Sequence, residues 1–481
     1  MSTTERNPEL ARLSLACDPN EAADETTFTP LNEARGSSLF AEVVLQDLRE
    51  TRGKRKWIFS GHVGCGKSSE LRHVAKKVSD PDMDGLRYLP VFVDVKPYLD
   101  LLYITPEAIQ LAIVAELADV FRALPDGGIK LDNGYFMQLF RDILNILRTP
   151  AESAEVEAGI AGFKAKFKYV FKSPSGRDKV QSFLRPQTAD VLAAINDLFA
   201  VATEKLKQYS RERNALPYDD FLVIVDTLDR VLKVPDAEMG FASHKKLFLT
   251  DAAQFSELDA HMIYTVPLPL ARTYAPALED LYGTEPYVLP MVKVCSRGDS
   301  KEYQPGYGAL REILRRRLGG QNPTDLIDED AFKYLVKYTG GYVREFVAAV
   351  GKSARMARGQ TITMNTVESV IANNYANYEN GIKQNWLPEI IELRNDPLHR
   401  IDIEDNQIRE MLEYHYILEY RNGFEDDDRK RRNTIWYALH PLVHDSEYLE
   451  HAMEALAEAG HAESASLPNA PVPPAPASDT A

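Results

Sequence analysis

The first three hundred residues alternate between two apolar patterns, which are short uninterrupted runs and longer stretches with helical spacing. The short runs are rich in β-branched and aromatic residues and are bounded by turn residues, which is typical of buried strands. They lie at 56–61, 86–96, 221–226, 261–267 and 287–294. Between them, amphipathic segments such as the one around Val44 and Leu48 predict helices. This alternation predicts an α/β fold with a five-stranded parallel sheet.

The second and third predicted strands are separated by about 125 residues, far more than one crossover helix needs. We therefore expect an insert with structure of its own at about 100–215. Three amphipathic patterns predict helices in it, at 104–124, 134–149 and 188–209. The stretch FKAKFKYVFK (163–172) alternates apolar with basic residues (Lys164, Lys166 and Lys168) and predicts a strand or hairpin. Its basic face is either solvated or contacts a phosphate backbone or an acidic partner.

The remaining chain divides by composition and pattern. Residues 301–380 are helical in pattern throughout and predict a helical lid. From 405 to 450 the predicted order is helix, strand, charged loop and strand, which resembles a winged helix. The organisation we expect is an N-terminal extension (1–38), a nucleotide-binding core with its insert (39–300), the helical lid (301–380), a winged-helix-like domain (381–460) and a disordered Pro/Ala/Ser-rich tail (461–481).

The formal net charge is −16, from 56 basic and 72 acidic residues. It argues against a surface that coats nucleic acid, because phosphate binding needs clustered cations. The three cysteines (Cys17, Cys65 and Cys295) predict no disulfide framework and favour a reducing compartment. The sequence has no apolar signal core at residue 1, and no apolar run approaches the ~20 residues of a membrane span. We expect a cytoplasmic protein without a membrane partner.

One glycine-rich stretch matches the phosphate-binding pattern G-x-x-x-x-G-K-[ST], with a predicted strand before it and a predicted helix after it. Its glycines let backbone N–H groups surround phosphates, Lys67 can reach the β- and γ-phosphates, and Ser68 can bind Mg²⁺. The positive end of the following helix adds to this attraction. The predicted nucleotide-binding residues are Gly61, His62, Val63, Gly64, Cys65, Gly66, Lys67, Ser68 and Ser69.

A carboxylate ends the most apolar predicted strand, FLVIVD. Asp226 at this position can hold Mg²⁺ together with Ser68. The next residue is Thr227, and the second carboxylate of the stretch is Asp229. We predict Asp229 as the catalytic base; the alternatives are a helix N-cap and a salt bridge to Arg230.

These motifs together resemble the AAA+/STAND group of ATPases, in particular NACHT-like and replication-initiator-like members. The D-x-L-D spacing after the strand is similar to the NACHT Walker B, and YTGGYVREF is similar to a sensor-2 motif with Arg344 as its arginine. Thr265 takes the sensor-1 position at the end of HMIYT. The phrase SGHVGCGKSSEL also resembles little-described bacterial ATPases, some of them found in defence-type operons. The resemblance covers about 28–380.

The resemblance implies ATP as the nucleotide and Mg²⁺ as its metal ion, and it assigns roles to Lys67, Asp226, Asp229, Thr265 and Arg344 in hydrolysis. The sequence departs from the group in its long insert and in lacking the glutamate that usually follows the Walker-B aspartate. For Arg344, the alternative is a surface arginine paired with Glu345. Two further arginines, Arg272 and Arg297, are candidates for a finger that acts on a neighbouring subunit, with a plain surface role as the alternative.

Three functional hypotheses follow from these residues. The preferred one is an ATP-dependent conformational switch with slow hydrolysis, which regulates a protein effector or assembles into a homo-oligomer, with antiviral signalling as its setting. The second is a DNA-binding initiator or loader, which the basic stretch at 163–172 would serve. The third is a scaffold that binds ATP or ADP without turnover. No guanine-reading N-K-x-D is present, and adenine is otherwise implied by the resemblance alone.

Overall fold

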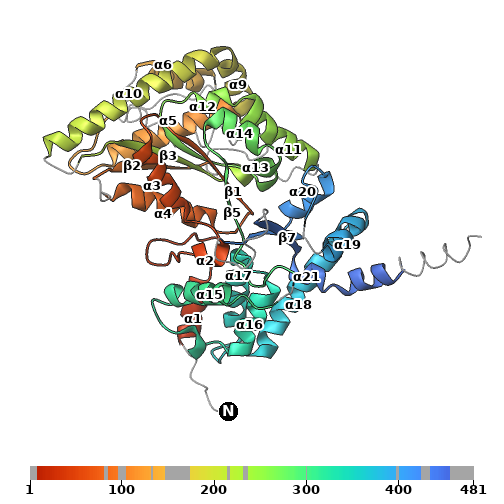
Figure 1. Ribbon diagram of the computed structural model, residues 1–481. Coiled ribbons are helices and arrows are strands. Elements are labelled where there is room, and N and C mark those ends of the chain that lie inside the picture. The colour runs from red at the N-terminus through yellow and green to blue at the C-terminus, as the bar shows by residue number, and fades with distance from the viewer. Residues whose placement is uncertain are drawn as a thin grey trace, which may run out of the picture.

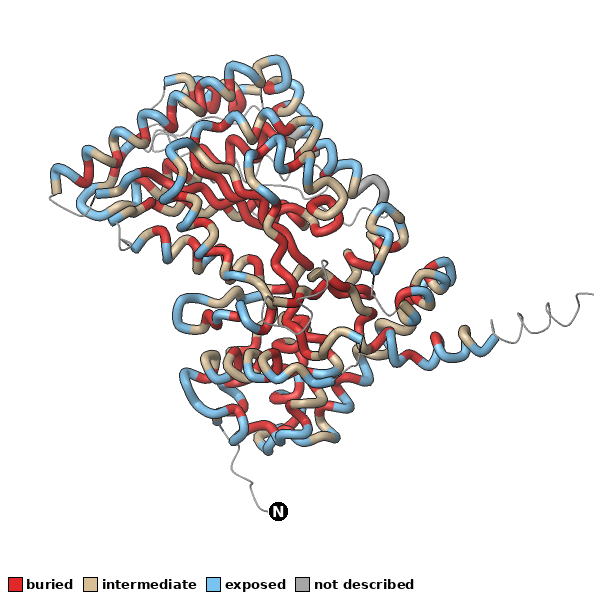
Figure 2. The backbone as a smooth tube through the Cα atoms, viewed as in Figure 1, coloured by how far each residue is buried: buried red, intermediate tan, exposed pale blue. Residues whose placement is uncertain are grey.

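The computed structural model describes residues 8–80, 85–95, 105–131, 134–146, 174–213, 217–230, 237–298, 301–396, 400–423 and 434–455. A sheet flanked by helices forms one part of the molecule, a helical unit forms a second, and the C-terminal unit lies beside both (Figure 1). Buried residues run continuously from the sheet into the helical unit (Figure 2). In the part of the chain that the structure describes, no helix is both long and apolar enough to cross a bilayer.

The five predicted strands are present and parallel, which confirms the α/β class. Their order in the sheet is β2-β3-β4-β1-β5, so β4 lies between the strand before the glycine-rich loop and the strand that ends in Asp226. The strands are β1 (Lys56–Gly61), β2 (Tyr88–Asp94), β3 (Asp220–Asp226), β4 (His261–Thr265) and β5 (Tyr287–Leu289).

Helices cover both faces of the sheet, because successive side chains of a strand point to opposite faces and both sets are apolar here. Leu222 and Ile224 of β3 pack with α3 (Phe40–Glu50) and α4 (Lys67–Ser79). Val223 and Val225 pack with helices of the other face. These helices are α5 (Pro106–Arg122), α10 (Thr188–Glu212), α12 (Ala253–Ser256) and α14 (Ala275–Tyr282).

Between β2 and β3 the chain forms α5, α6 (Gly134–Ile146), α9 (Pro174–Leu184) and α10, in the stretch where the insert is predicted. The alternating stretch 163–172 lies outside the described residues. Two helices follow β3 and β4 respectively, α11 (Ala237–Lys245) and α13 (Leu268–Thr273). Both lie at the end of the sheet that faces the C-terminal unit (Figure 1).

The helical unit contains α15 (Gln304–Arg317), α16 (Glu329–Tyr338), α17 (Val343–Met356) and α18 (Met364–Gly381). The segment expected to be an N-terminal extension contains α1 (Pro8–Ala16), which packs on α17. Leu10, Leu13 and Cys17 belong to the same apolar core as the lid helices. The spacing of these three residues is helical, so the signal was present in the sequence but short.

The C-terminal unit contains α19 (Leu387–Asn395), α20 (Asn406–Glu413), β6 (Ile417–Arg421), β7 (Ile435–Leu439) and α21 (Pro441–His444). The strands β6 and β7 pair antiparallel, so the predicted order of helix, strand and strand is observed. The charged loop predicted between the strands lies outside the described residues. Helix α20 packs on α11 and α13 of the core.

The turn between α16 and α17 packs closely against the segment that follows β5, and a substitution in this turn can test that packing. Gly341 has φ +75°, and a Cβ at this position would lie 1.8 Å from the carbonyl oxygen of Val292. We expect Gly341→Ala to lower the free energy of unfolding by at least about 2 kcal/mol, measured by chemical denaturation. Gly308→Ala is the matched control, because nothing lies within 4 Å of the added methyl in helix α15 and alanine favours a helix. Equal stability of Gly341→Ala and the parent would contradict this packing.

Candidate nucleotide-binding site

The glycine-rich loop joins β1 to α4 and has the backbone that its glycines permit. Gly61, Gly64 and Gly66 have φ values of +142°, +88° and +116°, a region that other residues rarely adopt. A Cβ on Gly64 would also lie 2.8 Å from the Tyr342 ring and 2.9 Å from Cβ of Arg344. The glycines therefore serve both the curvature of the loop and the close approach of the lid.

Lys67 is buried at the centre of this loop. Its Nζ donates to the carbonyl oxygens of Gly61 (2.6 Å) and His62 (2.8 Å) and lies 2.9 Å from Oδ2 of Asp229. Of the roles considered for Asp229, the pair with Arg230 is not observed, and its carboxylate is paired with Lys67. An N-cap would involve residues after Arg230 that lie outside the described ranges. A phosphate that binds Lys67 would compete with this carboxylate, because both are anions at the same ammonium group.

Asp226 and Ser68 lie together at the end of β3, as a shared Mg²⁺ site requires. The Ser68 side chain hydrogen-bonds to Asp226, whose Oδ1 also accepts from the Thr227 N–H at 2.7 Å. Burial, and then the nearby charge of Asp229, raises the pKa of Asp226. A divalent cation would relieve both effects, and Mg²⁺ is commonly bound by one or two protein groups plus phosphate oxygens and water. The residues present therefore fit Mg²⁺ and could hold it.

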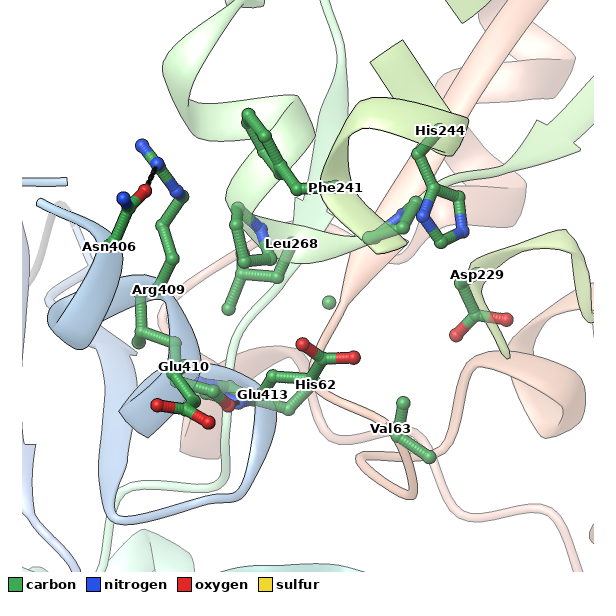
Figure 3. A pocket seen from close by; sticks show the side chains of 14 residues that line it. His62, Val63, Asp229, Phe241, His244, Leu268, Asn406, Arg409, Glu410 and Glu413 are labelled. Carbon is green, nitrogen blue, oxygen red and sulfur yellow. Dashed lines mark hydrogen bonds between the residues drawn. The ribbon is translucent and has the colours of Figure 1, made fainter. Parts of the chain in front are cut away.

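A cavity of about 220 Å³ opens in front of the loop. Of the predicted residues, it is lined by Gly64, Gly66, Lys67, Ser68, Ser69, Asp226, Asp229 and Arg344. Cys65, which belongs to the loop, has a fully buried side chain. Gly61, His62 and Val63 line a second cavity, of about 60 Å³, on the side of the C-terminal unit. Figure 3 shows this second cavity, with His62, Val63 and Asp229 facing Arg409 and Glu410 of α20.

Arg344 of α17 reaches the phosphate cavity, as the lid arginine should. Burial lowers its pKa first, and the charge of the neighbouring Arg230 lowers it further. The alternative partner, Glu345, instead contacts His440 (3.1 Å) and Tyr378 (3.1 Å). Two adjacent guanidinium groups in one cavity favour an anion between or beside them.

Thr265 is placed differently from the other predicted residues. It is fully buried at the end of β4, where its hydroxyl donates to the Val225 carbonyl (3.3 Å) and accepts from the Leu228 N–H (3.0 Å). It is not among the residues that line the phosphate cavity. Its role in this conformation is to brace the turn that follows β3.

The two arginines considered as fingers also lie away from the phosphate cavity. Arg272 of α13 forms a two-pronged pair with the buried Glu419 of β6, at 2.8 Å and 2.5 Å. It therefore joins the core to the C-terminal unit. Arg297 lies after β5 and is absent from the residues that line the cavity.

Sequence reasoning missed the contribution of the N-terminal segment to the site. Arg35 of α2 (Asn32–Arg35) is buried and donates to the carbonyl oxygen of Cys65 at 2.6 Å, so it holds the loop from behind. Residues 19–22 line the phosphate cavity, and the Ala23 N–H donates to the Ser69 hydroxyl at 2.9 Å. No motif announces a buried arginine in LNEARGSS, so this role needed the tertiary structure.

Two histidines connect the loop to the C-terminal unit. Nε2 of His62 accepts from the Glu419 N–H at 3.0 Å, which leaves Nδ1 to donate to the Leu412 carbonyl at 3.2 Å. His415 donates from Nε2 to the Val63 carbonyl at 2.8 Å and stacks on Tyr342 of the lid. The His62 imidazole must be neutral, because one of its nitrogens accepts a hydrogen bond. Burial lowers the pKa of His415 well below its usual value, which favours the neutral imidazole there too.

His415 occupies a position where glycine is more common. It follows α20 with φ +65°, its N–H bonds to the Leu412 carbonyl, and the N–H of Tyr416 bonds to the Met411 carbonyl. This is the hydrogen-bond pattern of a left-handed helix cap. A side chain at such a position costs about 1 kcal/mol relative to glycine, so its contacts with Val63 and Tyr342 have to compensate for the strain.

Comparisons with known proteins assign no role to the residues of this site. No protein-family model and no curated protein matches the sequence. Among solved structures, the chain is similar to one in a Drosophila ORC–DNA complex, with 10% identity, a TM-score of 0.38, and coverage of 94% of this chain and 93% of that one. It is also similar to a Walker-type ATPase of Pyrococcus abyssi, with 13% identity, a TM-score of 0.39, and coverage of 90% of this chain and 99% of that one. A third similar structure is Cdc6p of Pyrobaculum aerophilum, with 12% identity, a TM-score of 0.37, and coverage of 94% of this chain and 98% of that one.

The sheet order, the glycine-rich loop before α4 and the acidic end of β3 define an α/β P-loop NTPase fold, which is accompanied by a helical unit and a C-terminal unit. The class follows from the residues and their arrangement in this chain. Nucleotide binding is what such a loop, with Lys67, Ser68 and Asp226 around one cavity, is suited to do.

The burial of His62 predicts a pH dependence. Burial, and then the charge of Lys67, lowers its pKa from 6.5 to about 3. The unfolded chain therefore binds a proton that the folded protein does not, and stability falls as the pH drops through this window, by about 1.4 kcal/mol per pH unit. His62→Gln keeps a donor and an acceptor but does not titrate. We expect its stability to depend less steeply on pH between 6 and 4 in denaturation experiments.

The matched control for this experiment is His451→Gln, at an exposed position. It should follow the parent at every pH, because an exposed imidazole can stay hydrated in either charge state. Identical slopes for the parent and His62→Gln would show that the His62 imidazole is not held neutral by the interface.

Proposed function

We propose that this protein is an ATPase that binds Mg-ATP, hydrolyses it slowly and acts as a nucleotide-dependent conformational switch. The observation that carries the proposal is the direct bonding of the phosphate-binding loop to the C-terminal unit, through His62 and His415. A loop that only held a nucleotide would not need these contacts. Through them, a change in the loop has a short mechanical route to another unit.

The first step of the coupling lies at His62. Its carbonyl oxygen accepts from Lys67 on the side of the phosphate cavity, and its ring is bonded to Leu412 and Glu419 on the other side. Phosphate oxygens that draw Lys67 away would release the carbonyl oxygens of Gly61 and His62. His62, whose carbonyl oxygen would lose its bond from Lys67, is therefore the residue whose ring is hydrogen-bonded to the C-terminal unit.

The second step runs through the lid. Arg344 lies in the phosphate cavity, and the next residue, Glu345, is bonded to His440 of the C-terminal unit. The Tyr420 hydroxyl also donates to the carbonyl oxygen of Gly340 at 2.6 Å. An arginine that follows the γ-phosphate would thus move a helix whose first turn is attached to the C-terminal unit, a common design of nucleotide switches.

The contact between the core and the C-terminal unit combines apolar packing, to which Leu412, Leu418 and Trp436 contribute, with a set of polar contacts. Arg272 pairs with Glu419, and the Tyr437 hydroxyl donates to the same carboxylate at 3.1 Å. Each of these groups can be rehydrated when the units separate, whereas removing one partner in place would leave a buried charge, at about 3–5 kcal/mol. These paired polar groups make the closed arrangement specific.

Slow turnover is expected from the residues after β3. Thr227 stands where AAA+ ATPases usually carry glutamate, and Asp229 is engaged by Lys67. We place the regulated partner among protein effectors or further copies of this chain in an oligomer, and bacterial antiviral defence is the setting that the sequence phrase suggests. Helix α20, which precedes the β6–β7 pair, is packed on the core and carries both acidic and basic residues, so it is poorly suited to read DNA in this conformation.

The proposal is tested by light scattering coupled to size exclusion, small-angle scattering and phosphate release, with ADP and with a non-hydrolysable ATP analogue. We expect slow phosphate release and a difference in shape or mass between the two nucleotides. If shape, mass and partner binding are the same with both nucleotides, the proposed conformational switch is wrong. Tight binding without turnover would indicate a scaffold. Salt-sensitive DNA binding that is weakened by neutralising Lys164, Lys166 and Lys168 would indicate the DNA-binding alternative.

A variant of the histidine contact tests the coupling itself. His415→Asn keeps a residue that tolerates the left-handed backbone but removes the imidazole that reaches Val63 and Tyr342. We expect the form in which the C-terminal unit has separated from the loop to become about fivefold more populated in ADP, since one hydrogen bond contributes about 1 kcal/mol. The shape difference between ADP and the analogue should shrink accordingly.

The exposed His444, replaced by Asn, is the control for this variant and should behave as the parent does. A His415→Asn protein with the full nucleotide-dependent difference in shape would show that this contact does not couple the loop to the C-terminal unit.

A further inference from the structure

A third carboxylate lies at the edge of the sheet beside the phosphate cavity. Asp94 ends β2, and the register of the parallel pair places its Cα opposite that of Asp226 at the end of β3. Both residues line the phosphate cavity together with Lys67 and Ser68. The pattern VFVDVK gave Asp94 no role in the sequence, because only the pairing of β2 with β3 brings it to this site.

Asp94 is bonded to the residue that replaces the usual glutamate. The hydroxyl of Thr227 lies 2.8 Å from Oδ1 of Asp94 and 2.6 Å from the carbonyl oxygen of Asp226, so its single proton is shared between two acceptors. Thr227 is buried and has φ +69°. A β-branched residue is strained in this region, and such strain is found where the surroundings enforce it, often at functional sites.

Three more carboxylates line the cavity, namely Glu21 of the N-terminal segment, Asp226 and Asp229, and the last two have tasks that differ from the one inferred for Asp94. Asp229 is paired with the Lys67 ammonium at 2.9 Å, and both side chains are nearly inaccessible to solvent. Asp226 is bonded to the Ser68 side chain and to the Thr227 N–H, which suits it to hold the metal ion. Asp94 is only half-buried and faces the cavity from the neighbouring strand. It therefore lines the same cavity as the loop residues that would bind the phosphates, where it is available to contact a water molecule.

We propose that Asp94 is the carboxylate that orients and deprotonates the attacking water, and that Thr227 is the positioning residue that fixes its rotamer. This inference rests on the proposed ATPase function and replaces Asp229 as the base. In the step, the water oxygen forms a bond to the γ-phosphorus and the bond from that phosphorus to the β,γ-bridging oxygen breaks. The electron pair leaves with ADP, Asp94 takes the water proton and later releases it to solvent, and inorganic phosphate is the second product.

Asp94→Asn tests the base directly. General bases contribute about 10²–10⁴-fold, so we expect phosphate release to fall at least about 100-fold, while ATP affinity stays within about threefold of the parent. A second readout does not depend on turnover. Retention of ADP with aluminium fluoride, which mimics the transition state with its attacking water, should be lost. Retention of ADP with beryllium fluoride, which mimics bound ATP, should be kept.

Asp229→Asn should show the opposite pattern, with altered nucleotide affinity because it pairs with Lys67, but with capture of aluminium fluoride retained. Asp80→Asn, an exposed change at the end of α4, is the matched control. Parent-like hydrolysis by Asp94→Asn, or loss of aluminium fluoride capture in Asp229→Asn alone, would overturn the proposal. If the parent itself binds ATP but releases no phosphate, the proposed ATPase function fails instead.

Two variants of Thr227 test the same proposal if Asp94→Asn does not fold. Thr227→Val keeps the shape and the backbone strain but removes the hydroxyl, and should slow phosphate release about tenfold at unchanged ATP affinity. Thr227→Ser keeps the hydroxyl and should restore most of the rate. Equal rates for Val and Ser would exclude positioning through the hydroxyl. A shift of the pH–rate profile in Thr227→Val alone would support it, because a merely structural change would not move the profile.

Discussion

The imidazole of His62 links the glycine-rich loop to the C-terminal unit through two hydrogen bonds, and this link constrains both its charge and its tautomer. One nitrogen has to donate and the other has to accept, so the ring must be neutral and in one tautomer. Burial enforces this state, because a charged imidazole would lose its hydration and would lie near Lys67. The loop therefore forms part of the interface between the core and the C-terminal unit.

Around this contact, charged and polar groups are buried in pairs. Lys67 is paired with Asp229 and Arg272 with Glu419, and Arg35 binds the carbonyl oxygen of Cys65 behind the loop. Paired buried charges contribute little net stability but make wrong arrangements costly. The site is thus held in a specific geometry by interactions that a phosphate, a metal ion or water could replace. Exchangeable polar contacts of this kind suit the switch that we propose.

Several features were accessible from local pattern alone. The strands, the loop and the helix after it follow from apolar runs and glycine spacing, because these depend on neighbours in the chain. Asp226 lies at the end of β3 and Arg344 lines the cavity, and their predicted roles there stay predictions. Two other predicted residues have partners that the sequence did not indicate. Thr265 braces the turn through Val225 and Leu228, and Asp229 faces Lys67.

The residue order of this chain thus dictated its elements and the phosphate-binding loop, since period and glycine content are local properties. The partners of those elements were decided only in three dimensions. Sheet order places Asp94 opposite Asp226, the N-terminal segment brings Arg35 under the loop, and the return of the chain after α20 brings His415 to Val63. Such contacts join residues tens to hundreds of positions apart. They depend on the packing of whole elements, which no motif in the sequence encodes.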